Sequence, residues 1–429
     1  MKLLVALFVF SAALCAADSP APVTFYRDVA GILQQRCQGC HRAGEVAPMA
    51  FDTYTETRPW AKAIKQAVLS RKMPPWYAEG PAGKFHNDPS LSQPEIDKLV
   101  AWADTGAAAG NPLDAPPARH FAQGWSIQQP DQVFELPQPY EVPASGTIEY
   151  TYVIVPTGFT EDRWVTQAEV RPGNPAVVHH ANVYIREPGS GWLREYPAGK
   201  MFIPDERKDR AATGGSSSAG ASVREQVIVG FVPGRPPKQV PPGYAMLIPA
   251  GSDLVFQVHY TTNGKAAADR TRVGFVYAKT PPAKRVIRIQ ASNARFAIPP
   301  GAADYPVSGS AQLQIPCELL DAYPHMHLRG KSMALTAVYP TGEKDELVRV
   351  PHYDFNWQLI YEMKQPKILP KGTILRADAT FDNSPNNRFN PDSKAEVRWG
   401  DQSWEEMMVG FFDLAIPAKA DPAAVLAPQ

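Results

Sequence analysis

Apolar residues in the first quarter of the chain recur with the period of an α-helix. The residues that share such a helical face are Phe25, Val29, Ile32 and Leu33, followed by Trp60, Ile64 and Val68. Ser92 and Glu95 have the spacing of a capping box, with Pro94 in the first turn, and Gly106 is a suitable stop. The pattern therefore predicts a small all-α domain over residues 22–106, followed by an Ala-, Gly- and Pro-rich linker over 107–123.

Beyond residue 124 the periodicity changes to short alternating strands separated by Pro and Gly. The clearest examples are IEYTYVIVPTG, VVHHANVYI, DLVFQVHYTT, SMALTAVYP and ILRADATFD. This rhythm is typical of β-sandwiches and barrels. About 300 residues exceed one such domain, so we expect two all-β domains, over 124–285 and 286–420, divided within the Pro-rich stretch 279–306. The polar low-complexity segment 205–222 is predicted to be a surface loop of the first.

Residues 1–17 combine one Lys, about a dozen apolar residues and a small-residue end, the pattern of a secretory signal peptide. Cys15 falls inside this segment, and the residues before it fit a lipoprotein signal poorly. We therefore expect a periplasmic or secreted protein, and no later run of about twenty apolar residues predicts a membrane span. The 43 acidic and 43 basic residues balance without long runs of one sign, which argues against nucleic acid and favours small-molecule partners.

Cys37, Cys40 and His41 form a CxxCH sequence, the attachment signature of c-type haem, in which two thiols bind the vinyl groups and the imidazole ligates iron. A local disulfide or half of a zinc site is the alternative, but there is no second CxxC. Met73, followed by two prolines, is the candidate for the opposite axial ligand, with Met49 as its rival, and either could instead fill the core. Residues 24–106 resemble the small c-type cytochrome domains of bacterial exported oxidases and dehydrogenases, which implies one covalent haem c that passes single electrons.

Five of the nine histidines lie in three short clusters on predicted strands, His179-His180, His259 and His325-Met326-His327. His325 and His327 are two apart, so on a strand both project from one face and can converge on one ion. His179 and His180 would face opposite ways on a regular strand, so joint ligation requires a bulge or a strand end. The alternatives are one core and one solvent-facing imidazole there, and an ordinary polar position for His259.

Met407 and Met408 open a further predicted strand and point to opposite sides of it, so at least one of them should pack in a core. A thioether that completes a two-imidazole site is a chemically specific combination, because soft sulfur favours Cu(I) whereas zinc sites use thiolate, imidazole or carboxylate. Copper is therefore the metal that we expect. Cys317 has no His and Met partners arranged in sequence as a blue-copper site would require.

The ordered series VVHHANVY, LVFQVHYTTNG, YPHMHLRGK and EEMMVGFF resembles the copper type II, ascorbate-dependent monooxygenases, the group that holds dopamine β-hydroxylase and peptidylglycine amidating monooxygenase. The similarity spans about residues 130–415 and lies in the order and type of all six ligands. It implies two jelly-roll sandwiches that face each other across a cleft, with one copper each and two in all. By this resemblance the electron-storing site is His179, His180 and His259, and the catalytic site that binds oxygen and substrate is His325, His327 and Met407.

The chain also departs from that family. Animal members are rich in disulfides, whereas Cys317 is the one cysteine left outside the signal peptide and the CxxCH sequence. In the amidating enzymes an Arg two residues before the HxH motif holds the peptide carboxylate, and Tyr323 occupies that place here, which argues against peptide amidation. Tyr323, Tyr353, Phe355 and Trp357 could line an apolar pocket, although aromatic residues in strands more often belong to a core.

The function implied is hydroxylation of a C–H bond in a small organic substrate with O2, which takes two external electrons and releases the second oxygen atom as water. We expect the haem to replace or supplement ascorbate, with a periplasmic electron donor as partner. A non-enzymatic electron carrier with a copper-binding β module is the main alternative. A quinone-linked or nitrogen-oxide enzyme has less support, because no blue-copper ligand set is present.

Overall fold

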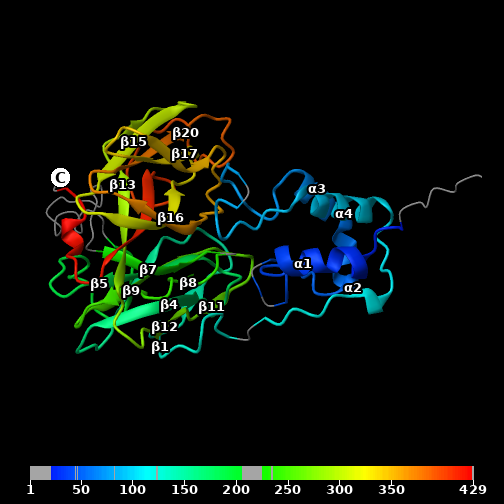
Figure 1. Ribbon diagram of the computed structural model, residues 1–429, viewed down its shortest axis with the longest axis horizontal. Helices are drawn as coiled ribbons and strands as arrows, with labels where there is room; N and C mark the ends of the chain where they lie inside the picture. Colours follow the sequence, from blue (N-terminus) through cyan, green and yellow to red (C-terminus); the bar gives the residue numbers. More distant parts are fainter. Residues whose placement is uncertain are drawn as a thin grey trace, which may run out of the picture.

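The computed structural model describes residues 21–43, 45, 47–81, 83–121, 124–204, 225–232 and 235–427. The expected signal peptide with Cys15 and the low-complexity segment 205–222 lie outside these residues. No helix in the described ranges is both long and apolar enough to cross a membrane. Most of the regular structure is β-sheet, which confirms the expected β-sandwich region, and the helices gather near the N-terminus (Figure 1).

The helical domain packs its helices around Leu33, Leu99 and Trp102, which are fully buried. Its elements are η1 Phe25–Val29, α1 Ala30–Arg36, α2 Tyr54–Thr57, η2 Arg58–Trp60, α3 Ala61–Leu69 and α4 Gln93–Asp104. The predicted capping box is present at the start of α4, and Gly106 follows its end with a φ of 90°, a conformation that glycine adopts without strain. Trp60 is the exception to the expected apolar face, because it ends a 3-10 turn and remains 39% exposed.

The first β unit has two sheets, packed around Phe256 and Phe275. One sheet holds β1 Gln132–Glu135, β12 Arg272–Tyr277, β4 Arg163–Arg171 and β9 Tyr244–Ile248, with β8 Lys238–Gln239 beside β4. The other holds β6 Met201–Phe202, β3 Thr151–Pro156, β10 Asp253–Tyr260, β5 Val178–Arg186 and β7 Glu225–Phe231, and a small ribbon pairs β2 Tyr140–Val142 with β11 Ala267–Asp269.

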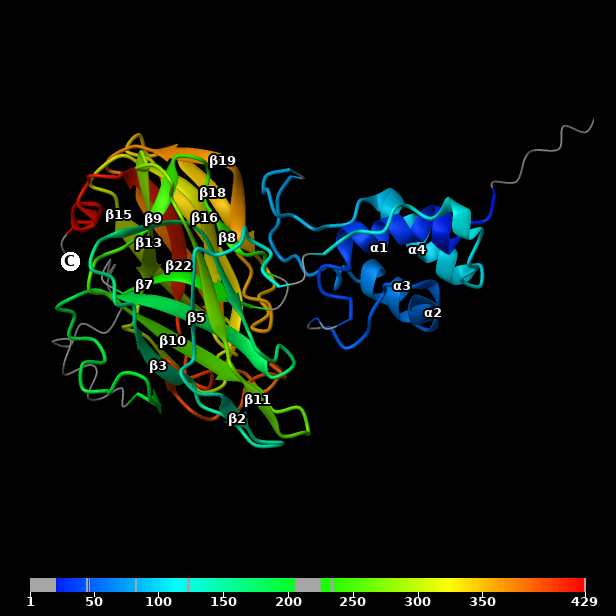
Figure 2. The same ribbon diagram turned by 90° about the horizontal axis from the view of Figure 1, so that it is seen from below.

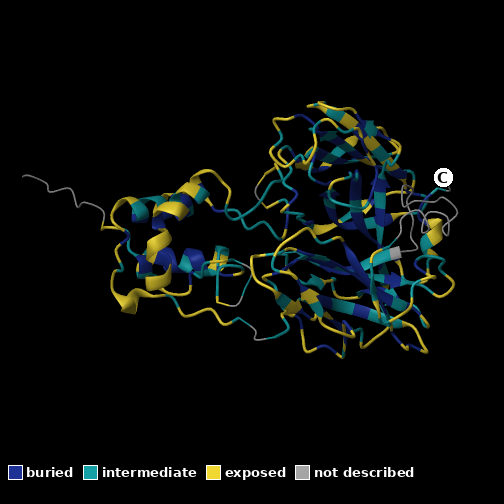
Figure 3. Cartoon of the chain, turned by 180° about the vertical axis from the view of Figure 1, so that it is seen from behind, coloured by how far each residue is buried: buried dark blue, intermediate teal, exposed yellow. Residues whose placement is uncertain are grey.

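The second β unit repeats this plan around a separate core that includes Phe381 and Phe412. One sheet holds β13 Lys284–Ser292, β22 Val409–Pro417, β16 Cys317–His325 and β19 Tyr361–Leu369, and the other holds β15 Tyr305–Gln312, β20 Ile374–Phe381, β17 Gly330–Val338 and β18 Lys344–Val350. Short elements complete the chain, namely β14 Ala297–Ile298 with β21 Val397–Arg398, η3 Pro112–Asp114 and η4 Pro422–Ala424. In Figure 3 the two buried cores are separate bands of dark blue.

The two β units are joined by a shared sheet rather than by a free linker. β9 pairs in parallel with the start of β13, where Lys284 lies opposite Tyr244, so one sheet runs from β1 to β19. The boundary expected between residues 285 and 286 therefore falls inside β13. The five clearest predicted strands correspond to β3, β5, β10, β17 and β20. Burial alternates clearly along β17 and β20, whereas most residues of β3 and β10 are buried on both faces.

The helical domain is also tied to the second β unit by its own chain. Between α3 and α4, residues 76–87 leave the helices and run along the edge of β18 and β19 (Figures 1 and 2). The Glu79 N–H donates to the Arg349 carbonyl at 2.8 Å, and the His86 N–H to the Glu362 carbonyl at 2.9 Å. We call residues 76–87 the bridging segment, and it was not anticipated from the sequence.

Candidate metal centres

A β-bulge brings the first three histidines together. In the pairing of β10 with β5, His259 lies opposite His180, but the next residue, Tyr260, lies opposite Val178. His179 is thus the extra residue of the bulge, so the two adjacent imidazoles do not have to face opposite ways. One ligand nitrogen from each of His179, His180 and His259 lies within 4.8 Å of the others. We call these three residues the first trio.

Burial keeps the imidazoles of the first trio neutral. It lowers the pKa of His179, lowers the pKa of His180 well below its usual value, and lowers the pKa of His259 to about 3. The buried Nδ1 of His259 has no hydrogen-bond partner among the described residues. Three neutral imidazoles, one of which has an unsatisfied buried nitrogen, are suitable ligands for a metal ion such as copper.

The second candidate set lies where β16 ends and β22 begins. His325 is the last residue of β16 and pairs with Val409, and its ring centroid is 5.3 Å from that of His327. Met407 lines the same cavity as both imidazoles, whereas Met408 is fully buried in the core of the second β unit. Both methionines precede β22 rather than opening it. We call His325, His327 and Met407 the second trio.

Each imidazole of the second trio is held by a hydrogen bond at Nδ1. The His325 Nδ1–H donates to Gln358 Oε1 at 2.8 Å, and the His327 Nδ1–H donates to the Glu405 carbonyl at 3.3 Å. Burial lowers the pKa of His325 to about 4 and that of His327 to about 3. Because Nδ1 carries the proton in both rings, Nε2 keeps its lone pair for a ligand, the arrangement typical of metal-binding histidines. The donor set fits copper.

Glu406 fixes the HxH turn to the methionine segment. Its carboxylate is fully buried and accepts the His327 N–H at 2.9 Å and the Arg329 N–H at 2.6 Å. Burial raises the pKa of Glu406 to about 8, although these backbone hydrogen bonds oppose the rise. Arg329 is buried as well and donates to Asn383 Oδ1 at 2.8 Å. The residue next to Met407 thus sets the position of His327.

One cavity of about 200 Å³ contacts both trios. His180 of the first trio and all three residues of the second line it, together with side chains from β3, β10, β13 and β22. Phe355 lies between the trios, with its ring centroid 5.8 Å from that of His179 and 6.0 Å from that of His327. Tyr150 packs against the rings of His180 and His259 at 5.1 and 4.6 Å.

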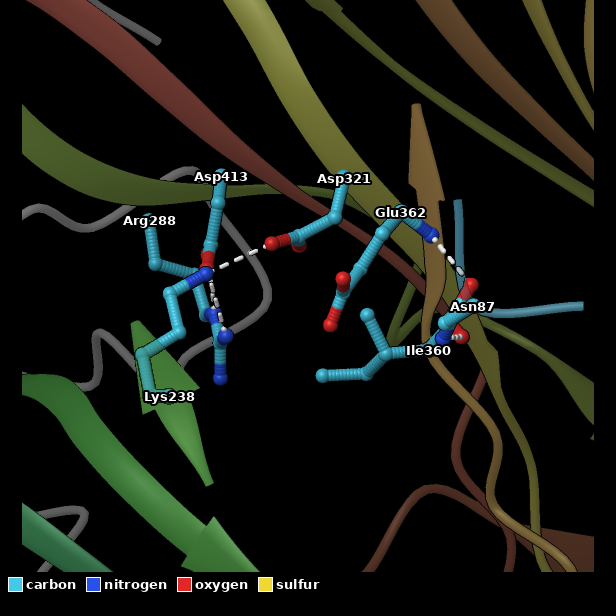
Figure 4. A network of polar contacts seen from close by, with 7 residues as sticks. All are labelled: Asn87, Lys238, Arg288, Asp321, Ile360, Glu362 and Asp413. Carbon is cyan, nitrogen blue, oxygen red and sulfur yellow. Dashed lines mark hydrogen bonds and ion pairs between the residues drawn. The ribbon is translucent and has the colours of Figure 1, made fainter. Parts of the chain in front are cut away.

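A buried ion network flanks this cavity at the junction of the β units (Figure 4). Lys238 Nζ lies 2.6 Å from carboxylate oxygens of both Asp321 and Asp413, and Arg288 Nε lies 2.6 Å from Asp413. Although burial opposes it, the charges of Arg288 and Lys238 hold the pKa of Asp413 well below its usual range. Burial, then the charge of Asp413, raises the pKa of Asp321 to about 6.

The CxxCH sequence begins where α1 ends, and its two thiols and one imidazole are the residue types that would hold a covalent haem. Cys37 and Cys40 are free thiols, so the local disulfide is absent from this part of the described chain. Burial raises the pKa of Cys37 to about 12. The His41 Nδ1–H donates to the Met49 carbonyl at 3.2 Å, which leaves Nε2 for iron, and Phe51 stacks on the imidazole at a centroid distance of 4.5 Å.

The two methionine candidates differ in their surroundings. Met49 packs against the helical core, and its carbonyl accepts the His41 Nδ1–H. Met73 follows α3, its N–H donates to the Ala67 carbonyl at 3.3 Å, and it precedes the bridging segment by two prolines. The choice of Met73 over Met49 as the second residue that would hold the haem stays a prediction.

Several residues that shape the centres escaped the sequence reasoning. Gln358 lies in a loop without a recognisable pattern, Tyr150 precedes a strand, and the bulge at His179 depends on a partner strand about eighty residues away. Glu406 directly precedes Met407, but acidic residues are mostly exposed, so its burial was not predicted either. Of the four aromatic residues expected near a pocket, Tyr323 lines the main cavity, Tyr353 and Trp357 line a smaller one, and Phe355 separates the trios.

No family model matches the chain, and no curated protein matches it. Among solved structures, weak matches are found to the VP2 protein of infectious bursal disease virus. A mutant VP2 is 10% identical and covers 71% of this chain and 74% of its own, with a TM-score of 0.19. The Gx strain structure is 9% identical over 71% and 77%, and a VP2 subviral particle is 11% identical over 69% and 75%, both with TM-scores of 0.19. Similarity this low carries no argument about the fold or the function.

Proposed function

We propose that the chain is an exported copper- and haem-dependent oxidoreductase of the copper type II monooxygenase kind, with one copper at each trio and two jelly-roll units. Its reaction would be hydroxylation of a C–H bond in a small organic substrate with O2. The observation that carries the proposal is that two separate ligand sets, three imidazoles and two imidazoles with a thioether, meet at one cavity. All five imidazoles have pKa values lowered by burial, so they are neutral donors at pH 7.

When bound, copper at the trios would supply single-electron redox chemistry and activation of dioxygen, and a haem attached at Cys37 and Cys40 would supply electrons singly. The chain's own part is to hold the donors and to exclude water. Gln358 and the Glu405 carbonyl fix the imidazole tautomers of the second trio, and Glu406 fixes its backbone. The overall balance takes two electrons and two protons, so that one oxygen atom enters the product and the other leaves as water.

The expected relay of electrons from the haem is supported by the bridging segment. It begins three residues after Met73, and its first residue, Trp76, has its ring centroid 4.9 Å from that of Tyr361 of the second β unit. Tyr77 and Tyr353 line one small pocket. The Tyr353 hydroxyl donates to the carbonyl of Met326, between the two histidines of the second trio, at 2.7 Å. The helical domain is therefore connected to the second trio through packed aromatic side chains.

Oxygen-dependent reoxidation of the haem tests the proposal. The full-length, copper-loaded protein, with its haem reduced by a one-electron donor, would be mixed with O2 and a panel of small organic compounds. Haem absorbance, O2 uptake and incorporation of labelled oxygen into products would be followed. We expect His327→Ala and His259→Ala each to abolish labelled product, and His352→Ala, at an exposed histidine outside both trios, to leave it unchanged.

Two outcomes contradict the proposal. Haem that stays reduced in the copper-loaded protein with O2 and every compound refutes the relay. Haem reoxidation that proceeds equally in the His327→Ala protein, without labelled product in either, refutes the monooxygenase and supports a plain electron carrier.

A further inference from the structure

Arg288 presents one unused guanidinium nitrogen at the wall of the main cavity. Its Nε and Nη2 donate to Asp413 at 2.6 and 2.9 Å, and its side chain is only 9% exposed. Its Nη1 is buried and has no hydrogen-bond partner among the described residues. A buried donor without an acceptor is destabilising, more so when the group is charged, so such a donor in a residue that lines a cavity points to a missing acceptor.

A second guanidinium lies close to it. Arg235 lines the same cavity, and burial, followed by the charge of Arg288, lowers its pKa. The negative charges of Asp321 and Asp413 oppose this decrease. Two arginines that repel each other in a buried position imply an anion between or beside them.

The charges around this corner do not balance. Three cations, Lys238, Arg235 and Arg288, meet the carboxylates of Asp321 and Asp413. Both oxygens of Asp413 are engaged by Arg288 and Lys238, and Asp321 already accepts from Lys238. Asp401 is the other acidic residue that lines the cavity. Its charge adds to the rise that burial causes in the pKa of Tyr150 and Tyr152, and Asp401 has an interaction partner besides them. The corner therefore holds three cations and two carboxylates, an excess of one positive charge, and Asp321 Oδ1 is a further buried atom without a hydrogen-bond partner among the described residues.

We propose that the Arg235 and Arg288 guanidinium groups bind the carboxylate of a small organic acid in this cavity. This inference rests on the proposed function in one respect, that the bound acid is the substrate. A single excess charge matches a monoanion better than a phosphate dianion. Guanidinium groups recognise carboxylates through paired N–H donors.

The side chains beside Arg288 on its sheet indicate the direction in which the bound acid would extend. Tyr323 and Phe411 stack on each other at 4.6 Å, and the Arg288 guanidinium lies 5.3 and 5.9 Å from their ring centroids. His325 is two residues further along β16, which at the rise of a strand is about 7 Å. An acid whose carboxylate meets Arg288 would thus lay its apolar body over the aromatic pair and extend it toward the second trio.

Phenylacetate and its neutral counterpart phenylacetamide test the inference by isothermal titration of the copper-loaded, full-length protein. We expect phenylacetate to bind at least tenfold more tightly than phenylacetamide. Arg235→Gln should weaken phenylacetate binding at least tenfold and leave phenylacetamide unaffected. Circular dichroism would verify that this variant folds. Arg398→Gln, at a 69% exposed side chain, is the control.

A second variant tests whether the loss of affinity is specific to Arg235. Arg288→Lys keeps a cation beside Asp413 but removes Nη1, and it should also reduce phenylacetate affinity at least tenfold. Equal binding of acid and amide, or an acid-to-amide ratio unchanged in Arg235→Gln, would overturn the carboxylate site. Displacement of phenylacetate by inorganic phosphate at lower concentration would overturn the choice of a monoanion. Because no turnover is measured, a chain that binds the acid but forms no oxygenated product refutes only the monooxygenase.

Discussion

The two trios hold their imidazoles in different ways. In the second trio both Nδ1 atoms donate to fixed acceptors, and Glu406 holds the backbone between the histidines. In the first trio His259 Nδ1 is buried and has no hydrogen-bond partner in the part of the chain that the structure describes, and the Nδ1 atoms of His179 and His180 lie 3.4 Å from each other. The second trio is therefore pre-organised by protein hydrogen bonds, whereas the first depends on a β-bulge and on whatever binds to it.

This difference separates two routes to a metal centre. A set of hydrogen-bonded ligands keeps its geometry when no metal is bound. It requires, however, that every buried polar group of the network has a hydrogen-bond partner. A set of unsatisfied imidazoles is destabilising until a ligand binds, so its metal contributes more to folding. We expect the first trio to respond more to metal removal and the second to respond more to changes in its neighbours.

Loss of Glu406 should have the largest effect on the second trio. Glu406→Ala removes the acceptor of two buried N–H groups, those of His327 and Arg329, which should cost about 2–6 kcal/mol of unfolding free energy. Urea denaturation monitored by fluorescence gives this value. Glu406→Gln keeps one acceptor oxygen and should lose about half as much. If Glu406→Ala matches the parent protein in stability and in copper content, the anchoring role is wrong.

The buried histidines should make acidification destabilise the metal-free protein, whereas Glu406 and Asp321, whose folded-state pKa values are raised to about 8 and about 6, act in the opposite direction. Because the folded-state pKa values of His259, His325 and His327 are about 3, 4 and 3, below the unfolded value near 6.5, the unfolded state takes up protons first as the pH falls. The contribution of these three histidines to the free energy of unfolding is complete above pH 6.5 and declines below it. Between pH 7 and 5.5 each histidine should cost about 1 kcal/mol, and the three together about 3–4 kcal/mol.

Denaturation curves at several pH values check this expectation. His259→Gln should reduce the dependence of the unfolding free energy on pH by about the contribution of one histidine. His352→Gln, at an exposed position, should leave this dependence unchanged. A slope identical in both variants would show that His259 is not buried as a neutral imidazole.

The smallest expected effect concerns Gln358, which fixes the tautomer of His325. Gln358→Leu removes the acceptor for Nδ1–H and should weaken copper at the second trio about 10- to 100-fold, with the first trio unchanged. Gln358→Glu retains an acceptor and serves as the control. Competition with a copper chelator separates the two affinities. A loss at the first trio instead would reverse the comparison between the trios.

The sequence predicted those elements whose cause is local. The capping box of α4, the stop at Gly106 and the strands β5 and β10 each depend on residues a few positions apart. Strand geometry alone required a bulge or a strand end beside His179, and a bulge is present. The residue pattern did not separate Met407 from Met408, and only the family resemblance favoured Met407, because the distinction depends on which side chain of the preceding loop meets the cavity.

What the sequence could not predict depends on long-range pairing. The shared sheet through β9 and β13 and the edge position of the bridging segment join residues far apart in the chain. Likewise Arg235 and Arg288 look like ordinary surface cations in sequence, and only the fold buries them beside the candidate ligands. Neither helical nor strand periodicity carries information about such contacts.

Metal analysis of the purified, metal-reconstituted protein tests the central claim most directly. We expect two coppers and one iron for each chain, one copper and one iron in the His325→Ala/His327→Ala variant, and unchanged values in Met408→Leu, whose side chain belongs to the core. Copper that stays at two for each chain in the double variant, or that is absent from the parent protein under the same conditions, would contradict the account of two separate copper centres.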